Sequence, residues 1–485
     1  MNISSIYTHC RHRVAPVIAL CILACCTAKE PPVTMAAIEK AENSGNFDAA
    51  TRMIDRYIAQ QQPSVDTVYD LYWRKEKMRR IELDFHKSKD DVLKYVRRYY
   101  PSANDDSLAH WESAGTMEFM LINGEKRYFD RAAPNLFRLD PAAIARKAET
   151  MKDYIDAKTE TLKVHLPAVV NAANRAVKSP PHTVHVKYTL TLAADAVPDG
   201  ETVRCWLPYP RSDHHRQTNV KLLAVNDSNY IISPSQYAHS SLYMEKTARA
   251  DSVLTFACEF SFQTTPEWYG LEHRQLSEYD KGSAIYRKYT AERPPHILFS
   301  DSIKAISKRI VGDETNPYRK VRKIFEWVDA AFPWAGAREY CTIDNIPAYV
   351  LHTRHGDCGQ VTLLFMTLAR YNGIPTRWQS GFMVHPHSEN LHDWCEYYIE
   401  GIGWIPLDQS FGVNTFADSD DVRYFYSNGM DAYRWIVNSD CAETFFPAKL
   451  FPRSDNVDFQ RGELEWRGGN IYYDLWDYNF DVTIE

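Results

Sequence analysis

The chain has 485 residues, of which 45% are hydrophobic and 25% charged. This length corresponds to about three domains of ordinary size, and the balanced composition excludes collagen-like, low-complexity and wholly disordered chains. Lysine and arginine number 56 against 63 aspartates and glutamates, so the formal charge is -7, and the basic residues form no continuous stripe. Nucleic acid is therefore not expected as a partner.

Residues 1–24 are typical of an export signal. Two arginines precede an apolar run over residues 14–24, which is shorter than the roughly 20 residues that span a bilayer. The run ends in Ile22-Leu23-Ala24-Cys25, a sequence that resembles the bacterial lipobox. This resemblance implies a lipid anchor on Cys25 and a place in the bacterial cell envelope, facing the periplasm or the surface. The alternatives are Cys26 as acceptor, or a plain cleaved signal with incidental cysteines.

Residues 25–180 are expected to form a mostly helical domain. Apolar residues recur at helical spacing on both sides of a turn at residues 43–46, which predicts a helical hairpin. Ser88 with Asp91 predicts a helix-capping box, and Asn123-Gly124 predicts a β-hairpin turn. No pattern in this region indicates catalysis, so we interpret it as a packing or docking domain.

Residues 181–265 are expected to form an antiparallel β-sandwich. Alternating apolar and polar residues predict strands at 184–192 and 254–262, with turn-forming residues between the strands. Cys205 and Cys258 share strand faces with apolar neighbours, which favours two buried core thiols and leaves a disulfide between them as the alternative.

The remaining residues, 266–485, carry the candidate chemistry. Cys358 follows Gly356-Asp357 and opens a helical stripe that ends at Gly373. The positive end of a helix dipole favours a thiolate, the form that a sulfur nucleophile requires. Asp357 opposes this effect, so a cationic neighbour such as an imidazolium is needed.

A predicted hairpin supplies that neighbour. His392 begins the apolar part of one strand, and Asp408 ends the next strand after a turn at residues 400–403. If the hairpin closes tightly over Gly401-Ile402, Asp408 pairs with Cys395 and faces away from His392. A bulge at Pro406 is then expected to restore the facing, and Glu396 is the second candidate for the acid.

Four motifs together resemble the bacterial transglutaminase-like superfamily; they are Gly356-Asp357-Cys358-Gly359, Gly373-Ile374-Pro375-Thr376-Arg377, His392-Asp393-Trp394 and Gly403-Trp404-Ile405-Pro406-Leu407-Asp408. The resemblance covers residues 320–412. It implies an α+β fold with a papain-like core, in which Cys358 is the nucleophile, His392 the general base and then acid, and Asp408 the residue that orients the imidazole. Where family members commonly have Ala and Pro, this chain has Asp393 and Gln409.

The expected function is an exported thiol enzyme that cleaves amide or peptide bonds through a thioester, without a cofactor or metal. Its expected substrates are peptides or proteins, among them peptidoglycan peptides. Hydrolysis is favoured over transfer to an amine, because a thioester in water hydrolyses unless the site excludes water. The alternatives are transglutaminase-type transfer and a catalytically silent module that binds glycan or peptide. A metal site formed with Cys358 is a further alternative; its other candidate ligands are His352, His355, His385 and His387. For the oxyanion, the backbone N–H of Cys358 is the expected donor, with Tyr340 and Trp334 as further candidates.

Overall fold

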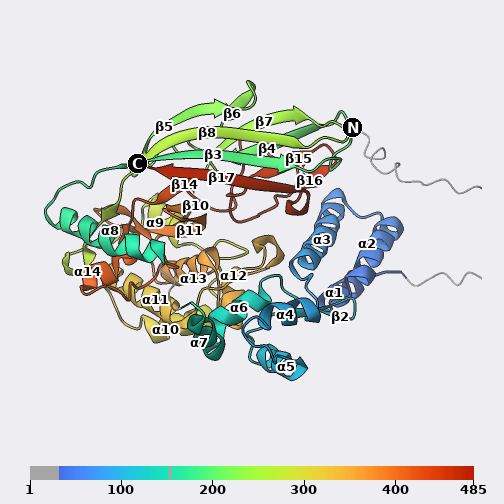
Figure 1. Cartoon of the computed structure of the whole chain (residues 1–485), viewed down its shortest axis with the longest axis horizontal. Helices are drawn as coiled ribbons and strands as arrows, with labels where there is room; N and C mark the ends of the chain where they lie inside the picture. The colour runs from blue at the N-terminus through green and yellow to red at the C-terminus, as the bar shows by residue number, and fades with distance from the viewer. Residues whose placement is uncertain (1–31, 152–155) are drawn as a thin grey trace, which may run out of the picture.

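The computed structural model describes residues 32–151 and 156–485. Within these residues, buried apolar side chains gather into three cores, one in an N-terminal helical unit, one in a β-sandwich and one around the helix that begins at Cys358. The α+β fold class predicted from the sequence is confirmed. In Figure 1 the sandwich lies along one side of the molecule, and the helices of the other two units lie below it.

The N-terminal unit consists of short helices and one β-hairpin. Its elements are α1 (Met35–Asn43), α2 (Phe47–Gln61), α3 (Val65–Asp84), α4 (Lys89–Val96), α5 (Asp105–Ser113), β1 (Phe119–Ile122), β2 (Glu125–Tyr128), α6 (Ala132–Leu139) and α7 (Pro141–Glu149). The predicted capping box of Ser88 and Asp91 is present at the start of α4. Asn123 and Gly124 both have positive φ and join β1 to β2, as the sequence predicts. The turn and cap residues in the sequence therefore correctly predict where α4 begins and where the β-hairpin turns.

The next helix, α8 (Ala157–Asn174), does not belong to the N-terminal core. Its apolar residues Leu162, Leu166 and Val169 are buried in the core around α13. The stretch 25–180, which the sequence presents as one helical domain, thus contributes to two cores.

The β-sandwich is built from two antiparallel sheets. One has the order β17-β3-β8-β5 and the other the order β16-β15-β4-β7-β6. The strands are β3 (His182–Leu192), β4 (Thr202–Pro208), β5 (Gln217–Val225), β6 (Tyr230–Ile232), β7 (Ser241–Thr247), β8 (Leu254–Thr264), β15 (Glu463–Trp466), β16 (Gly469–Ile471) and β17 (Trp476–Ile484). Cys205 and Cys258 are buried free thiols, so the alternative of a disulfide between them is wrong.

Strands from the C-terminal end of the chain complete both sheets. β17 pairs with β3 along its whole length, and β15 pairs with β4. The sequence boundary at residue 265 leaves β15, β16 and β17 out of the sandwich. Because these pairings join segments that lie far apart along the chain, no local pattern could indicate them.

The unit that carries the candidate site places helices against another antiparallel sheet, of order β12-β11-β10-β14. Its elements are β9 (Glu267–Trp268), η2 (Leu271–His273), α9 (Ala284–Thr290), α10 (Asp301–Ile310), α11 (Pro317–Ala331), η3 (Tyr340–Thr342), α12 (Ile346–Thr353), α13 (Cys358–Tyr371), β10 (Thr376–His385), β11 (Ser388–Ile399), β12 (Gly403–Leu407), α14 (Asp420–Arg423), η4 (Phe425–Ser427), β13 (Gly429–Met430) and β14 (Arg434–Asn438). Part of this sheet also joins the sandwich core: the rings of Phe382 and Trp435 stack with centroids 4.0 Å apart and pack against Tyr188 of β3. The short helix η5 (Tyr473–Leu475) joins β16 to β17 in the sandwich.

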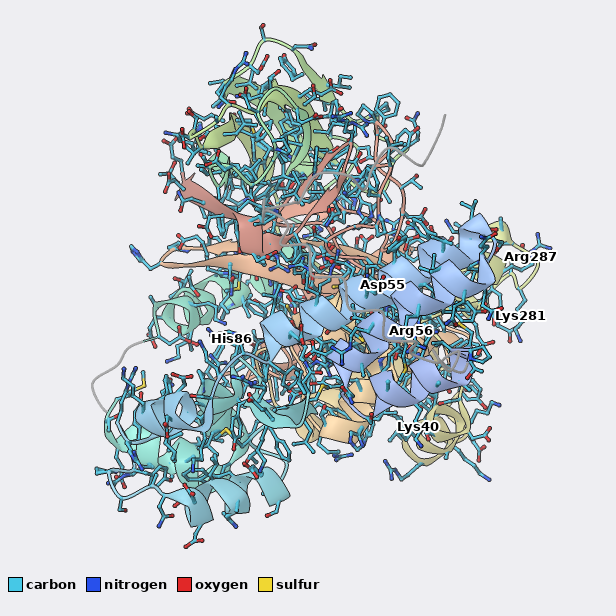
Figure 2. The ribbon with its side chains drawn as sticks, turned by 90° about the vertical axis from the view of Figure 1, so that its right-hand side faces the viewer. Lys40, Asp55, Arg56, His86, Lys281 and Arg287 are labelled. Atoms are coloured by element: carbon cyan, nitrogen blue, oxygen red, sulfur yellow. The ribbon has the colours of Figure 1, made fainter. Side chains whose placement is uncertain are left out.

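The helical unit is attached to the other two units by polar contacts. Asn135 of α6 exchanges two hydrogen bonds with the backbone of Gly336, at 2.8 and 2.9 Å. Arg80 of α3 is fully buried and donates to the backbone carbonyls of Arg453 and Ser454 at 3.0 Å. Figure 2, which labels Lys40 on α1 and Asp55 and Arg56 on α2, shows the face of the molecule on which these helices lie.

Candidate active site

Cys358 is the first residue of α13, where the sequence predicts a helix to begin. Asp357 caps this helix, since its carboxylate accepts from the N–H of Gln360 at 3.0 Å and the Gln360 side chain accepts from the N–H of Asp357 at 3.3 Å. Among the residues that the structure describes, the backbone N–H of Cys358 itself has no hydrogen-bond acceptor. One residue therefore offers both a sulfur and a free donor at the positive end of a helix dipole.

Gly359 makes room for a tyrosine beside this helix start. A Cβ at position 359 would lie 2.2 Å from the hydroxyl oxygen of Tyr340 and 2.6 Å from Oδ2 of Asp393. The single proton of the Tyr340 hydroxyl lies between Asp357 Oδ1, 2.7 Å from the hydroxyl oxygen, and Asp393 Oδ2, 3.2 Å from it. The glycine that follows the cysteine in the motif thus permits a close packing contact.

His392 and Asp408 form a buried hydrogen-bonded pair. His392 Nε2 lies 2.6 Å from Asp408 Oδ2, and both residues are almost completely shielded from solvent. β11 pairs with β12 so that Cys395 faces Leu407. One step further along this register places Asp408 opposite Trp394, on the face of β11 that also carries His392.

The tight two-residue turn over Gly401-Ile402 that the sequence suggested is wrong. Ile399 pairs with Gly403, so the turn contains residues 400–402 and shifts the register by one. Pro406 pairs regularly with Glu396, and no bulge interrupts this ladder. The facing of His392 and Asp408 therefore follows from turn length alone.

Arg434 holds the orienting carboxylate from another strand. Its Nη2 donates to Asp408 Oδ2 at 2.9 Å, and its Nη1 donates to Asp431 Oδ1 at 3.0 Å. The N–H of Phe411 donates to the other oxygen of Asp408 at 3.1 Å. Burial alone would raise the pKa of Asp408, but His392 and Arg434 outweigh burial and hold that pKa below its usual value.

These contacts define the state of the imidazole. Burial lowers the pKa of His392 against the opposing effect of Asp408, so the ring is neutral at pH 7. An ionised Asp408 accepts, and Nε2 must therefore carry the ring proton. Within the described residues, Nδ1 of His392 has no hydrogen-bond partner, which leaves its lone pair able to accept a proton.

The sulfur of Cys358 contacts a different residue. Its Sγ lies 3.3 Å from Oδ2 of Asp393, with the thiol as donor. Asp393 follows His392 in β11, and neighbouring side chains of a strand leave opposite faces. No hydrogen bond joins Cys358 to His392 in the described part of the chain. Of the three predicted site residues, the structure pairs His392 with Asp408 and places Cys358 against Asp393.

The surroundings of the sulfur favour the thiol. Burial raises the pKa of Cys358 well above its ordinary value, and the carboxylates of Asp393 and Asp357 raise it further. The thiolate expected from the helix dipole is therefore not the favoured form in this conformation. The helix dipole lowers the pKa of the Cys358 thiol, but burial and the two neighbouring acids raise that pKa by more.

The other candidates from the sequence have different partners. Glu396, the second candidate for the acid, binds Arg377 at 2.7 Å and His214 at 3.2 Å. The Tyr340 hydroxyl lies between the two carboxylates described above, and the ring of Trp334 lies 4.2 Å from the guanidinium of Arg138. Among the described residues, no group of three or more His, Cys, Asp or Glu side chains is arranged to hold a metal ion.

Sequence reasoning did not identify three residues of this site as contributors. Asp393 was noted only as a departure from the family pattern, while Arg434 and Gln460 carried no signal at all. Gln460 donates at 2.8 Å to Asp393 Oδ1 and at 2.9 Å to the carbonyl oxygen of His392. The sequence offered one indication of this contact, the aspartate at position 393. Because Asp393 directly follows His392 in a strand, its side chain must point to the opposite face of the sheet and meet the elements packed there.

A cysteine at a helix start, packed near an antiparallel sheet with a buried His–Asp pair, is the arrangement of a papain-like core. Residues 304–409 match the model of the transglutaminase-like superfamily. This part of the chain belongs to that superfamily, as the motifs predict.

Individual relatives are distant. An uncharacterised protein of Haemophilus influenzae is 21% identical over 256 residues, covering 47% of this chain and 69% of the relative. A "Putative Cysteine Protease" from Cytophaga hutchinsonii is 13% identical and covers 64% of this chain and 91% of its own, with a TM-score of 0.42. The periplasmic domain of TgpA from Pseudomonas aeruginosa is 12% identical and covers 48% of this chain and 88% of its own, with a TM-score of 0.24.

Cys25 and the predicted signal lie outside the described residues. Over residues 32–151 and 156–485, no helix has the length and apolar character that a membrane span requires.

Proposed function

We propose that this chain is a thiol-dependent hydrolase of amide or peptide bonds. Cys358 is its nucleophile, His392 its general base and then acid, and Asp408 the residue that orients the imidazole. The observation that carries the proposal is the buried hydrogen bond from His392 to Asp408, which leaves Nδ1 of the imidazole able to accept a proton. Membership of residues 304–409 in the superfamily supports the same assignment.

In the proposed reaction the sulfur first turns from Asp393 to the imidazole. The thiol proton moves to Nδ1 of His392 while the sulfur forms a bond to the carbonyl carbon, and the oxyanion accepts from the free N–H of Cys358. The C–N bond then breaks as the imidazolium returns its proton to the leaving amine. Water, deprotonated by His392, attacks the thioester, the C–S bond breaks and the sulfur regains its proton.

Asp408 contributes by orientation and charge. Its carboxylate fixes the Nε2–H tautomer and stabilises the imidazolium that forms during each proton transfer. Arg434 shares this carboxylate, which keeps it ionised but also weakens its pull on the imidazole. The base is therefore neutral at rest and acquires charge only during the reaction.

The test is hydrolysis of peptide and muropeptide libraries by purified protein. Cys358→Ala should abolish cleavage, whereas Cys395→Ala, which removes another buried thiol from β11, should retain it. Cleavage by Cys358→Ala would refute the proposal. A labelled amine added in parallel separates hydrolysis from transfer, because its incorporation into a glutamine donor would identify a transferase. Binding of muropeptides without turnover would identify a silent module.

We further propose that the enzyme is anchored by acyl chains on Cys25 and acts at the cell envelope on peptide or protein substrates, among them peptidoglycan peptides. The export signal and the lipobox-like sequence support this address. Cys25→Ser should move the protein from the detergent phase to the aqueous phase in a Triton X-114 partition. Partition of wild type into the aqueous phase would contradict an anchor.

A further inference from the structure

Acidic groups surround the sulfur of Cys358. Asp393 accepts from it across 3.3 Å, and Asp357 caps its helix. The carboxyl of Asp458 lies next to that of Asp393 and raises its pKa, after the larger effect of burial. One oxygen of Asp458 is buried without a hydrogen-bond partner. The proposed nucleophile therefore lies in a site where carboxyl groups are already concentrated and resist ionisation.

Asp393 is held firmly in place toward the sulfur. Gln460 donates to Oδ1 at 2.8 Å, and Tyr340 donates to Oδ2 at 3.2 Å. The side chain is buried, and the absence of a Cβ at Gly359 allows its Oδ2 to approach the helix. A carboxyl fixed by neutral donors on both oxygens has little freedom to turn away from the thiol.

No cation compensates these acids within the part of the chain that the structure describes. The titratable groups that act on the sulfur are Asp393 from β11 and Asp357 from the helix cap, with Tyr340 of η3 beside them, and Asp458 from the segment before β15 acts on Asp393. No lysine or arginine of the described residues forms an ion pair with any of the three aspartates. Glu339 also acts on Asp357, but its own carboxylate is paired with Arg461.

We infer that Asp393 keeps Cys358 protonated in the resting enzyme and thereby controls when the sulfur becomes a nucleophile. The thiol donates to Oδ2 of Asp393, and loss of its proton would end this hydrogen bond and add a negative charge beside the acid pair that Asp393 forms with Asp458, so this contact selects the protonated form. The proton remains on the sulfur until the side chain turns away from Asp393 or until the carboxyl at position 393 is replaced. The raised pKa of Cys358 agrees with this role.

This inference rests on the proposed function only for the identity of the nucleophile. Its readout is the chemical reactivity of one thiol and needs no substrate. Loss of the proposed amidase activity and loss of this control are therefore separate results.

The experiment measures alkylation of Cys358 by iodoacetamide, quantified on the peptide that contains this residue, from pH 5 to pH 10. In Asp393→Asn the rate at pH 7 should rise at least tenfold, because one pKa unit corresponds to about a tenfold change in thiolate. The control is Asp440→Asn, a buried aspartate that pairs with Arg293, for which the rate should stay within twofold of wild type. An unchanged or slower rate in Asp393→Asn would overturn the inference.

Wild-type protein provides a second, independent measurement. Its alkylation rate should still be rising at pH 9, above the usual pKa of about 8.5 for cysteine. A rate that levels off between pH 6 and pH 7 would indicate a preformed thiolate and would overturn the inference even if the variant did not fold.

Discussion

Gly359→Ala tests whether the packing at the start of α13 is as close as the structure describes. Alanine is the better helix former, which by itself would stabilise the helix by about 1 kcal/mol. The new methyl group would lie 2.2 Å from the Tyr340 hydroxyl and 2.6 Å from Asp393 Oδ2, so neighbouring groups must move. Overpacking costs about 1–3 kcal/mol, and hydrogen bonds to charged groups that are lost cost about 1.5–3 kcal/mol. We expect a net destabilisation of about 2–4 kcal/mol.

The assay is urea unfolding followed by tryptophan fluorescence, with the slope of the transition compared between variants. Tyr340→Phe removes the hydroxyl that the methyl group displaces. In the double variant, the combined loss should therefore be smaller than the sum of the single losses by about 1.5–3 kcal/mol. The reasoning is refuted if Gly359→Ala is as stable as wild type, or if the two losses simply add.

Three further predictions concern buried charges. Arg434→Met leaves the buried Asp408 and Asp431 without their cation and should destabilise the protein by about 3–5 kcal/mol in urea unfolding. A loss below about 1 kcal/mol would contradict the ion pairs that Arg434 forms with these two aspartates. Burial opposes ionisation of Glu396, but Arg377 outweighs it and holds its pKa well below the usual value, so its stabilisation is complete above about pH 5 and is lost as pH falls. Glu396→Gln should flatten the decline of melting temperature from pH 5 to pH 3, and an equally steep decline would count against this pair. Burial, followed by Glu339, raises the pKa of Asp84 to about 7. The stabilisation from the protonated carboxyl is therefore complete below about pH 4 and is lost as pH rises through 7. In thermal unfolding, Asp84→Asn should lose less stability than wild type between pH 4 and pH 7, and an unaltered pH dependence would argue against this burial.

Local sequence signals predicted the parts of the site that depend on local structure. The capping residue Asp357 and the apolar stripe after it are sufficient to place a helix start at Cys358. The strand of His392 was also recognisable from its alternation. The register of Asp408 was not, because the hairpin could close over two residues or over three. Gly401 and Gly403 both adopt positive φ, which permits the longer turn.

Contacts between distant segments were beyond local patterns. Arg434 reaches Asp408 from a strand at the other side of the sheet, and Gln460 reaches Asp393 from a loop 67 residues further along the chain. The same limitation applies to β17, which pairs with β3 to complete the sandwich. Such pairings depend on how the whole chain folds, so each segment carries only its own propensity for strand or loop.

The alternation of β11 places two neighbouring proton acceptors on opposite faces of one strand. His392 and Asp393 leave opposite faces of the strand, so the thiol can hydrogen-bond to only one of them at a time. Contact with Asp393 preserves the proton, while contact with the neutral Nδ1 of His392 allows it to leave. If both proposals hold, the step that starts catalysis is a change of partner by Cys358. A residue without a carboxyl at position 393 would then remove the resting state while leaving the His392–Asp408 pair intact, and this is the physical reason to expect faster alkylation without a loss of the base.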